Sequence, residues 1–266
     1  MSELITVCTQ AALEAGALLK ANFGNSGLRI ERKVDQSLVT NVDKEAERLI
    51  VSKIKGKYPG HGFIGEEGGR NGPDSDSEYI WIIDPLDGTH NFIRGINMFG
   101  VSIGVAHQSR FVAGVIYLPV SEELYVAEYG NGAYKNGRKI KVSDCQNLGE
   151  CMVSFDSGIK KAPLREVQIL QEVAIHTFGL RMFGTSVRQL TYLAEGVLDG
   201  IVEFDDHPWD FAAGACIVIE AGGMITNLQG ETLTHKDTGF FASNGKVHQQ
   251  LRGIVQGESI QARNGS

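Results

Sequence analysis

Hydrophobic positions recur at helical spacing near the start of the chain and form shorter runs further on. In residues 4–23 the apolar side chains return every three or four positions, and Gly24 follows as a natural stop. The same period continues through residues 40–57, and a Tyr-Pro-Gly segment at 58–60 closes it. The pattern therefore predicts two helices that each pack an apolar face.

Short apolar runs then replace the helical spacing. Residues 79–83 are almost wholly apolar, as in a strand buried on both faces, and Pro85 makes further strand pairing unfavourable. Consecutive strands are expected over 101–106, 111–117 and 123–128. Asn136 and Gly137 then form a strong hairpin-turn signal. A mainly antiparallel sheet gives this half α+β character.

The second half alternates between strands and helices. The expected elements are, in order, a strand at 152–155, a helix at 164–175, a strand at 180–183, a helix at 187–194, a strand at 201–204, a helix at 211–221, and strands at 224–226 and 239–242. We predict an N-terminal α+β half over residues 1–145 and a smaller C-terminal α/β half over 146–266. Because no Pro/Gly/Ser linker separates them, we expect one continuous globular body.

Composition narrows the class of protein. The 266 residues are 42% hydrophobic and 21% charged, which is ordinary for a globular protein and argues against disorder. The net charge of -7 argues against an electrostatic grip on nucleic acid over the whole surface, although it does not exclude a local basic patch.

The four cysteines indicate a reducing compartment. Cys8, Cys145, Cys151 and Cys216 show no C-x-x-C spacing, so we interpret them as reduced thiols of a cytoplasmic protein. The N-terminus has no basic segment leading into an apolar core, and no uninterrupted apolar stretch approaches membrane-spanning length.

The stretch 81–92 carries the candidate chemistry, because its apolar strand leads into Asp84 and Asp87 and then into Gly88 and Thr89. A glycine turn before a helix offers free backbone N–H groups that favour an anion. Two carboxylates beside an anion are compatible only if hard cations lie between them, and Mg²⁺ fits best. The alternative is that both Asp residues are ordinary turn residues.

Residues 84–92 resemble the central signature of the inositol monophosphatase family, a family of Mg²⁺-dependent, lithium-sensitive sugar-phosphate phosphatases. Segments 63–67 and 208–214 resemble the other two metal-site motifs of that family, in the correct order. With segment 38–43, the resemblance spreads over nearly the full chain, and its motifs are specific for the family more than for the substrate.

The resemblance implies a layered α/β/α/β/α sandwich, the inositol-monophosphatase-like (sugar phosphatase) fold, and a homodimer. It also implies two to three Mg²⁺ ions per site. The implied metal ligands are Glu66, Asp84, the carbonyl of Leu86, Asp87 and Asp210. The implied catalytic residues are Thr89, Asp43 and Glu66, with Asp43 and Thr89 orienting the attacking water.

The implied substrate contacts are Gly88, Thr89, Ser186 and Glu203. The backbone N–H groups of Gly88 and Thr89 would hold the phosphate, the turn at Ser186 would touch the sugar, and Glu203 would accept a sugar hydroxyl. Plainer interpretations remain open. Ser186 or its neighbour Thr185 suits a helix N-cap, and Glu203 suits a strand position that points to water.

Asp43 and Asp210 also have a plainer interpretation, since each lies where an acid stabilises a helix N-terminus. Asp205 and Asp206 add local acid that nothing in the sequence forces into the site. Arg188 departs from the family pattern. It would contact a second phosphate, a partner subunit or water, and we favour the solvated position.

The resemblance therefore implies a hydrolase that releases phosphate from inositol 1-phosphate by metal-activated water. Related substrates remain alternatives: fructose 1,6-bisphosphate, histidinol phosphate or a 3′-phosphonucleotide. An alternative of another class is a transcription-associated binding protein, because some bacterial members of the family bind the transcription machinery.

Overall fold

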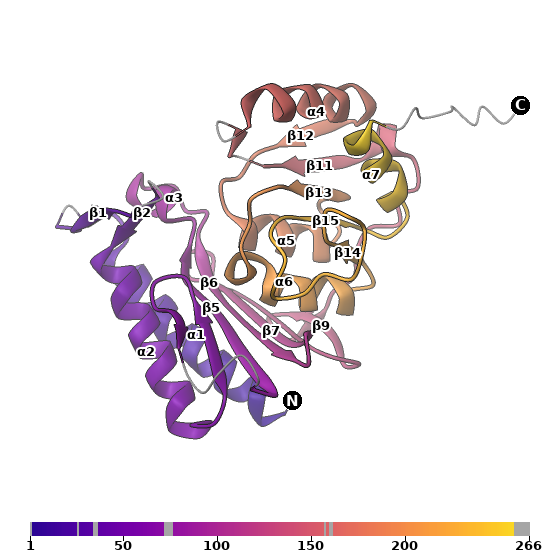
Figure 1. Cartoon of the computed structure of the whole chain (residues 1–266). Helices are drawn as coiled ribbons and strands as arrows, with labels where there is room; N and C mark the ends of the chain where they lie inside the picture. The colour runs from indigo at the N-terminus through magenta and orange to yellow at the C-terminus, as the bar shows by residue number, and fades with distance from the viewer. Residues whose placement is uncertain are drawn as a thin grey trace, which may run out of the picture.

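The described residues build two large β-sheets, which lie on either side of a pair of helices, and a separate two-stranded sheet (Figure 1). The computed structural model describes residues 2–25, 27–33, 37–71, 77–156, 158–159 and 162–257. The helices of the described residues are α1 (Glu3–Asn22), α2 (Asn41–Lys57), α3 (Thr89–Ile93), η1 (Leu148–Glu150, a 3₁₀ turn), α4 (Pro163–His176), α5 (Ser186–Ala194), α6 (Pro208–Glu220) and α7 (His248–Gln256).

The first large sheet has the strand order β10-β9-β8-β7-β6-β5-β3-β4, and all its pairs are antiparallel except β3 with β5. Its strands are β3 (Gly62–Gly65), β4 (Gly69–Asn71), β5 (Tyr79–Asp87), β6 (Gly100–His107), β7 (Arg110–Leu118), β8 (Glu123–Glu128), β9 (Gly132–Lys135) and β10 (Arg138–Lys139). The antiparallel character predicted from the sequence is confirmed.

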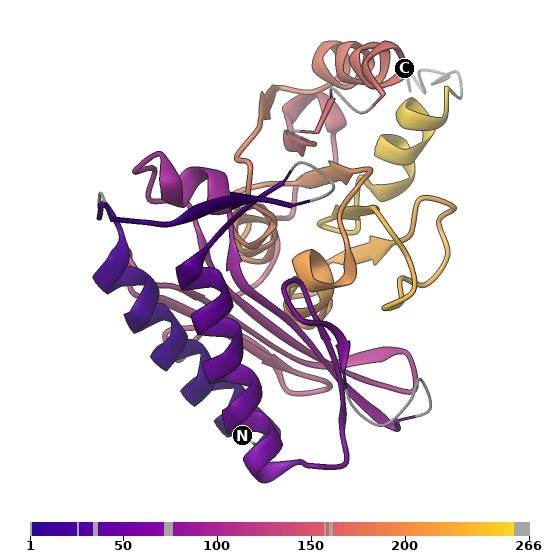
Figure 2. The ribbon, with the colours of Figure 1, turned by 60° about the vertical axis from the view of Figure 1, so that its left-hand side comes forward.

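The second sheet has the order β12-β11-β13-β15-β14 and mixes parallel with antiparallel pairs. Its strands are β11 (Met152–Phe155), β12 (Gly179–Arg181), β13 (Gly200–Glu203), β14 (Met224–Thr226) and β15 (Phe240–Ser243). A separate hairpin of β1 (Ile30–Arg32) and β2 (Leu38–Thr40) stands beside α3, beyond the ends of α1 and α2 (Figure 2).

Three apolar clusters fill the spaces between the layers. One packs α1 and α2 on the outer face of the first sheet, a second joins the inner face of that sheet to α5, α6 and the second sheet, and a third lies beneath α4 and α7. The order of layers is therefore helix, sheet, helix, sheet, helix, which confirms the predicted α/β/α/β/α sandwich (Figure 1).

Helix α1 is long and apolar enough, by length and composition, to cross a membrane, which the sequence analysis did not indicate. In this fold its apolar face packs on the first sheet and on α2, with Ile5, Cys8 and Leu19 fully buried. Burial of such a face is what stabilises an amphipathic helix in a globular protein.

Strand β5 departs from the prediction at its end. The sequence indicated that pairing stops before Pro85, yet β5 continues to Asp87 and pairs that residue with Gly100 of β6. The register shifts between Asp84 and Asp87, so the proline lies within a bulge, where its missing N–H group breaks no ladder bond. The bulge places both carboxylates at the same end of the sheet.

A pair of glycines lets helix α6 lie close on the first sheet. Gly104 of β6 and Gly114 of β7 are direct cross-strand partners. A Cβ atom on Gly114 would lie 2.3 Å from the carbonyl oxygen of Ala213, and one on Gly104 would lie 2.7 Å from the Cβ of Ala212. The lack of side chains at these two positions therefore lets α6 lie close to the first sheet. The first turn of α6 carries Asp210.

We predict that Gly114→Ala destabilises the protein by about 2 kcal/mol, because the new methyl group overlaps the backbone of α6. Urea unfolding at neutral pH measures the change. Gly56→Ala is the matched control, since a Cβ there meets nothing within 4 Å and helix α2 gains a better helix former. Equal stability of the Gly114 variant and the wild type would contradict this packing.

Candidate metal and substrate site

Three carboxylates converge where the end of β5 meets the start of α6. Oxygen atoms of Asp84, Asp87 and Asp210 all lie within 4.8 Å of one another. Asp84 and Asp87 are buried and Asp210 is partly buried. Strands β6 to β13 lie between Asp87 and Asp210 in the sequence, so it is the fold that brings these two residues together.

Asp87 is held by the turn before α5. Its Oδ2 atom accepts hydrogen bonds from Thr185 Oγ1 at 2.7 Å and from the backbone N–H of Val187 at 2.5 Å. Thr185 is the N-cap residue of α5, as the plainer interpretation expected, but its side chain makes no cap hydrogen bond to the helix. Its hydroxyl instead orients a carboxylate of the cluster.

The other two carboxylates are fixed by neighbouring backbone donors. The N–H of Leu86 donates to Asp84 Oδ1 at 2.9 Å, and the N–H of His207 donates to Asp210 Oδ2 at 2.7 Å. Asp210 thus closes a capping box on α6 as well as joining the cluster. The helix N-terminus adds partial positive charge beside these acids.

Electrostatics in this cluster favour protonation or a bound cation. Burial, followed by the charges of Glu66, Asp87 and Asp210, raises the pKa of Asp84 well above its usual value. Burial also raises the pKa of Asp87 to about 6, even though the donors at Val187 and Thr185 oppose the shift. Desolvated oxygens that repel one another are a ligand set suited to a hard divalent ion.

Glu66 and Glu67 lie beside this cluster in the turn between β3 and β4. The N–H of Glu66 donates to the carbonyl of Ile83 at 3.2 Å, and Lys33 Nζ lies 2.7 Å from Glu66 Oε1 and 2.5 Å from Glu67 Oε1. Burial raises the pKa of Glu66 to about 7, while Lys33 lowers it. The hydrogen bond to Ile83, the residue before Asp84, thus connects this turn to the carboxylate cluster.

Glu47 is a site neighbour that the sequence analysis missed. It is buried, and its Oε2 atom accepts a hydrogen bond from the N–H of Glu67 at 2.9 Å. A signal was present, because Glu47 follows Asp43 by four residues and so shares its face of α2. The same helix therefore positions two acids toward the site.

Asp43 and Thr89 meet as a buried pair. Thr89 Oγ1 lies 3.1 Å from Asp43 Oδ1 and 3.0 Å from the carbonyl oxygen of Leu86. Asp43 Oδ2 accepts a hydrogen bond from the N–H of Thr40 at 3.0 Å, which also caps α2. Asp43 therefore does both things expected of it: it stabilises the N-terminus of α2 and contacts Thr89.

Gly88 supplies the turn between the cluster and α3. Its φ of 89° lies in the left-handed region, and a Cβ there would lie 2.8 Å from the carbonyl oxygen of Met98. Asn91, one turn along, donates to the carbonyl oxygens of Met98 and Phe183 at 2.8 and 2.9 Å. These bonds tie the short helix to the segment before α5.

A cavity of about 200 Å³ opens beside the cluster on the side of the second sheet. Its lining residues are Asp87, Asp156, Gly158, Gly184, Thr185, Ser186, Glu203, Asp205, Asp206 and Asp210. Nothing in the sequence forced Asp205 and Asp206 into the site, and the fold brings both to the cavity wall. Asp156 was missed, although its place just after β11 is where ligands meet a parallel strand pair.

The two predicted sugar contacts lie in this cavity wall. Ser186 Oγ donates to Asp206 Oδ2 at 2.5 Å rather than capping α5. Glu203 is buried and accepts a hydrogen bond from Gln189 Nε2 at 2.5 Å, so the solvated alternative for Glu203 is wrong. Ser154 Oγ in turn donates to Gln189 Oε1 at 2.6 Å. A fixed polar wall results.

Arg188 is buried, so the prediction that it is solvated is wrong. Its guanidinium donates to Glu123 Oε2 at 2.8 Å and lies over the ring of Tyr192. Glu123 also pairs with Lys135 at 2.5 Å. Burial alone would raise the pKa of Glu123, but the hydrogen bonds from Lys135 and Arg188 outweigh it and hold that pKa at about 2.

The layered fold is the sugar-phosphatase fold, and the acidic cluster within it could hold a metal ion. The family model of the inositol monophosphatase family matches residues 1–259. The chain belongs to the inositol monophosphatase family.

Individual relatives carry different names. The chain is 38% identical to a fructose-1,6-bisphosphatase/inositol-1-monophosphatase of Aquifex aeolicus, over 93% of both chains. It is 37% identical to a Nus factor SuhB of Vibrio cholerae, over 87% of this chain and 88% of the relative. Among solved structures, the extragenic suppressor protein suhB of Bartonella henselae matches with a TM-score of 0.91 and 34% identity, over 96% of this chain and 99% of the other.

We predict that Glu123→Gln destabilises the protein by about 2 kcal/mol at neutral pH, because the buried Arg188 loses its charged partner and Lys135 keeps only Glu195 of its two carboxylates. The matched control is Glu122→Gln, which breaks only the exposed pair with Lys20 and is expected to leave stability unchanged.

The pH dependence has a definite sign. The folded pKa of Glu123 is depressed, so its contribution is present above the unfolded value of 4.5 and is lost as pH falls toward 2. Urea unfolding of both variants at neutral and acidic pH checks this. A difference between them that persists unchanged in acid would contradict the assignment.

Proposed function

We propose that the chain is a Mg²⁺-dependent phosphomonoesterase that hydrolyses inositol 1-phosphate to inositol and phosphate by metal-activated water. The observation that carries the proposal is the convergence of the Asp84, Asp87 and Asp210 oxygens within 4.8 Å at a sheet edge. The donor set is all oxygen, which is the preference of Mg²⁺.

The chain offers ligands for two to three ions. Glu66, Asp84 and the carbonyl of Leu86 would hold the first, and Asp84, Asp87 and Asp210 would hold the second. A third would lie near Glu66. When bound, Mg²⁺ lowers the pKa of a coordinated water and stabilises the charge that develops on the leaving oxygen.

Thr89 and Asp43 would orient the attacking water. The Thr89 hydroxyl lies within hydrogen-bonding distance of Asp43 Oδ1, and donation to that carboxylate leaves the hydroxyl oxygen free to accept a hydrogen bond from water. Asp43 is itself fixed by Thr40, so the pair needs little rearrangement to act.

Polar groups around the cavity would bind the substrate. The backbone N–H groups of Gly88 and Thr89 begin α3 and are suited to phosphate oxygens. Ser186 and Glu203 line the cavity beside the metal ligands, at the place where a polyol would lie. The carboxylate of Glu203 would accept a hydroxyl proton.

Other phosphate esters remain candidates for the same chemistry. They are fructose 1,6-bisphosphate, histidinol phosphate and a 3′-phosphonucleotide. The name of the Aquifex aeolicus relative supports the first of these. Arg188 does not support a bisphosphate substrate, because its guanidinium is already paired with Glu123.

We predict that Asp87→Asn or Asp210→Asn lowers Mg²⁺-dependent turnover at least about a thousandfold while the protein stays folded, because each removes a charged metal ligand. Phosphate release and circular dichroism measure the two effects. The matched control is Asp144→Asn, an exposed residue paired with Lys141, which should retain full turnover. Retained activity in either site variant would overturn the proposed function.

The substrate is tested by phosphate release from inositol 1-phosphate, fructose 1,6-bisphosphate, histidinol phosphate and adenosine 3′,5′-bisphosphate, with and without Mg²⁺ and lithium. We expect inositol 1-phosphate to turn over fastest, only with Mg²⁺, and to be inhibited by lithium. Faster turnover of another ester would keep the mechanism and change the substrate. No turnover of any ester would contradict the enzymatic proposal.

A second candidate function is binding to the transcription machinery, which the names of the SuhB relatives favour. It is compatible with catalysis. Capture of transcription proteins by the Asp87→Asn variant at wild-type level would separate this role from turnover. Loss of capture in that variant would make the metal site part of the interaction.

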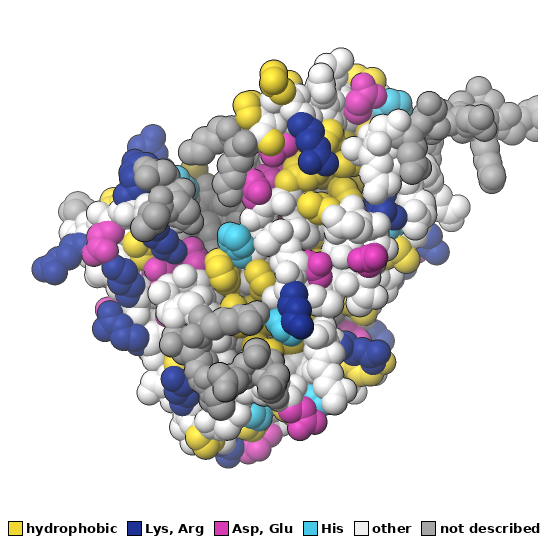
Figure 3. Space-filling view, in the orientation of Figure 1, with side chains coloured by type: hydrophobic (Ala, Val, Ile, Leu, Met, Phe, Trp, Pro, Cys, Tyr) yellow, Lys and Arg dark blue, Asp and Glu magenta, His cyan; other side chains and the backbone are white. Residues whose placement is uncertain are grey.

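We also propose a cytoplasmic homodimer. Exposed apolar side chains on and after α4 support a subunit contact there, and hydrophobic side chains are visible at the top of Figure 3, where Figure 1 labels α4. The exposed apolar residues on and after α4 are Leu164, Val167, Ile175, Phe178 and Met182.

A further inference from the structure

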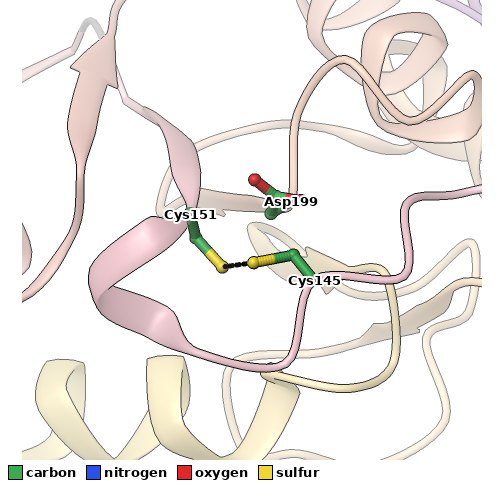
Figure 4. A group of neighbouring side chains, drawn as sticks. All are labelled: Cys145, Cys151 and Asp199. Carbon is green, nitrogen blue, oxygen red and sulfur yellow. Dashed lines mark hydrogen bonds between the residues drawn. The ribbon is translucent and has the colours of Figure 1, made fainter.

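Two cysteines lie side by side where the chain passes from the first sheet to the second. Cys145 precedes the η1 turn and Cys151 follows it, and their Sγ atoms are 3.4 Å apart (Figure 4). Both sulfurs also lie within 3.4 Å of the carbonyl oxygen of Asn147. The sequence analysis interpreted all four cysteines as reduced thiols with no C-x-x-C spacing, and the fold is what brings these two together.

The turn that carries the two thiols is fastened on both sides. Asp199 accepts hydrogen bonds from Ser143 Oγ and, at 2.8 Å, from the N–H of Met152. Asn244 Nδ2 donates to Ser143 Oγ at 2.9 Å and to the carbonyl oxygen of Cys145 at 2.8 Å. These bonds hold the thiols together in the folded chain, so the second thiol has a high effective concentration at the first.

A metal ion is the other ligand that such a cluster suggests, because Asp199 lies within 4.8 Å of both sulfurs. The carboxylate of Asp199 already accepts a hydrogen bond on each oxygen. The group offers three donors among the described residues, whereas a structural zinc site uses four. The arrangement suits sulfur–sulfur bonding better than metal binding.

We propose that Cys145 and Cys151 are a reversible dithiol–disulfide site. A disulfide bond is about 2.05 Å long, so the sulfurs need to approach by only about 1.4 Å through side-chain rotation. The bond would close a short ring around η1 and fix the entry of the chain into β11.

The two thiols have different parts in the exchange. Cys145 is partly exposed and reaches a small disulfide from solvent, whereas Cys151 is fully buried and burial raises the pKa of its thiol. Cys145 therefore attacks first, as a thiolate. Cys151 attacks second, within the protein, where the short distance between the two sulfurs compensates for the raised pKa of its thiol.

The exchange is balanced with oxidised glutathione as the oxidant. The Cys145 thiolate bonds to one glutathione sulfur and releases the other glutathione as a thiolate. Cys151 then loses its proton, bonds to the sulfur of Cys145, and releases the second glutathione as a thiol. One small disulfide is reduced to two thiols while the two protein thiols are oxidised to one disulfide.

The experiment treats the whole protein with excess oxidised glutathione and EDTA, alkylates remaining thiols in denaturant, and analyses tryptic peptides by mass. Residues 142–160 form one tryptic peptide that contains both cysteines, while Cys8 and Cys216 fall in other peptides and serve as internal controls. We expect the 142–160 peptide to lack alkylation and to be about 2 Da lighter than the reduced peptide.

Two variants and a melting curve complete the test. Cys151→Ser should stop at a mixed disulfide on Cys145, and Cys145→Ser should leave Cys151 reduced. Oxidation of the wild type should raise its melting temperature by about 4 °C, reversibly with dithiothreitol, and leave both variants unchanged. Alkylation of both cysteines in the wild-type peptide, or a stable mixed disulfide there, would overturn the proposal.

Discussion

The rest of the structure depends on one constraint: several desolvated carboxylates lie close together at the C-terminal end of β5, which costs free energy while they are charged. Asp84 and Asp87 lie on either side of a bulge in β5, and Asp210 reaches them from α6. Burial and mutual repulsion raise the pKa of Asp84 and Asp210. The fold offsets part of this cost with backbone donors, and a hard cation would offset the rest.

The two sheets have to be fixed relative to each other for these acids to meet. Helix α6 lies between them, close on the first sheet because Gly104 and Gly114 have no side chains. Helix α5 is tied to the first sheet by Arg188 and Glu123, and the turn before α5 holds Asp87. Packing, an ion pair and hydrogen bonds thus position a single site.

Periodicity and motif order were enough to predict most helices and strands, the layered fold and the residues around the acid cluster. What they missed depends on tertiary contacts. The bulge at Pro85 needs β6 as a partner, and the buried Arg188 is paired with Glu123 of β8. Asp206 lines the cavity, where it accepts a hydrogen bond from Ser186. Local sequence contains no signal for such pairings, whereas Glu47 was detectable from its spacing.

The most direct measurement of the central claim is the melting temperature of the wild-type chain in EDTA and in excess Mg²⁺ at matched ionic strength. A ligand that binds only the folded state stabilises it by mass action. If the carboxylate cluster is a cation site, Mg²⁺ raises the melting temperature by several degrees and Na⁺ does not. Identical melting temperatures in EDTA and in Mg²⁺ would contradict the account.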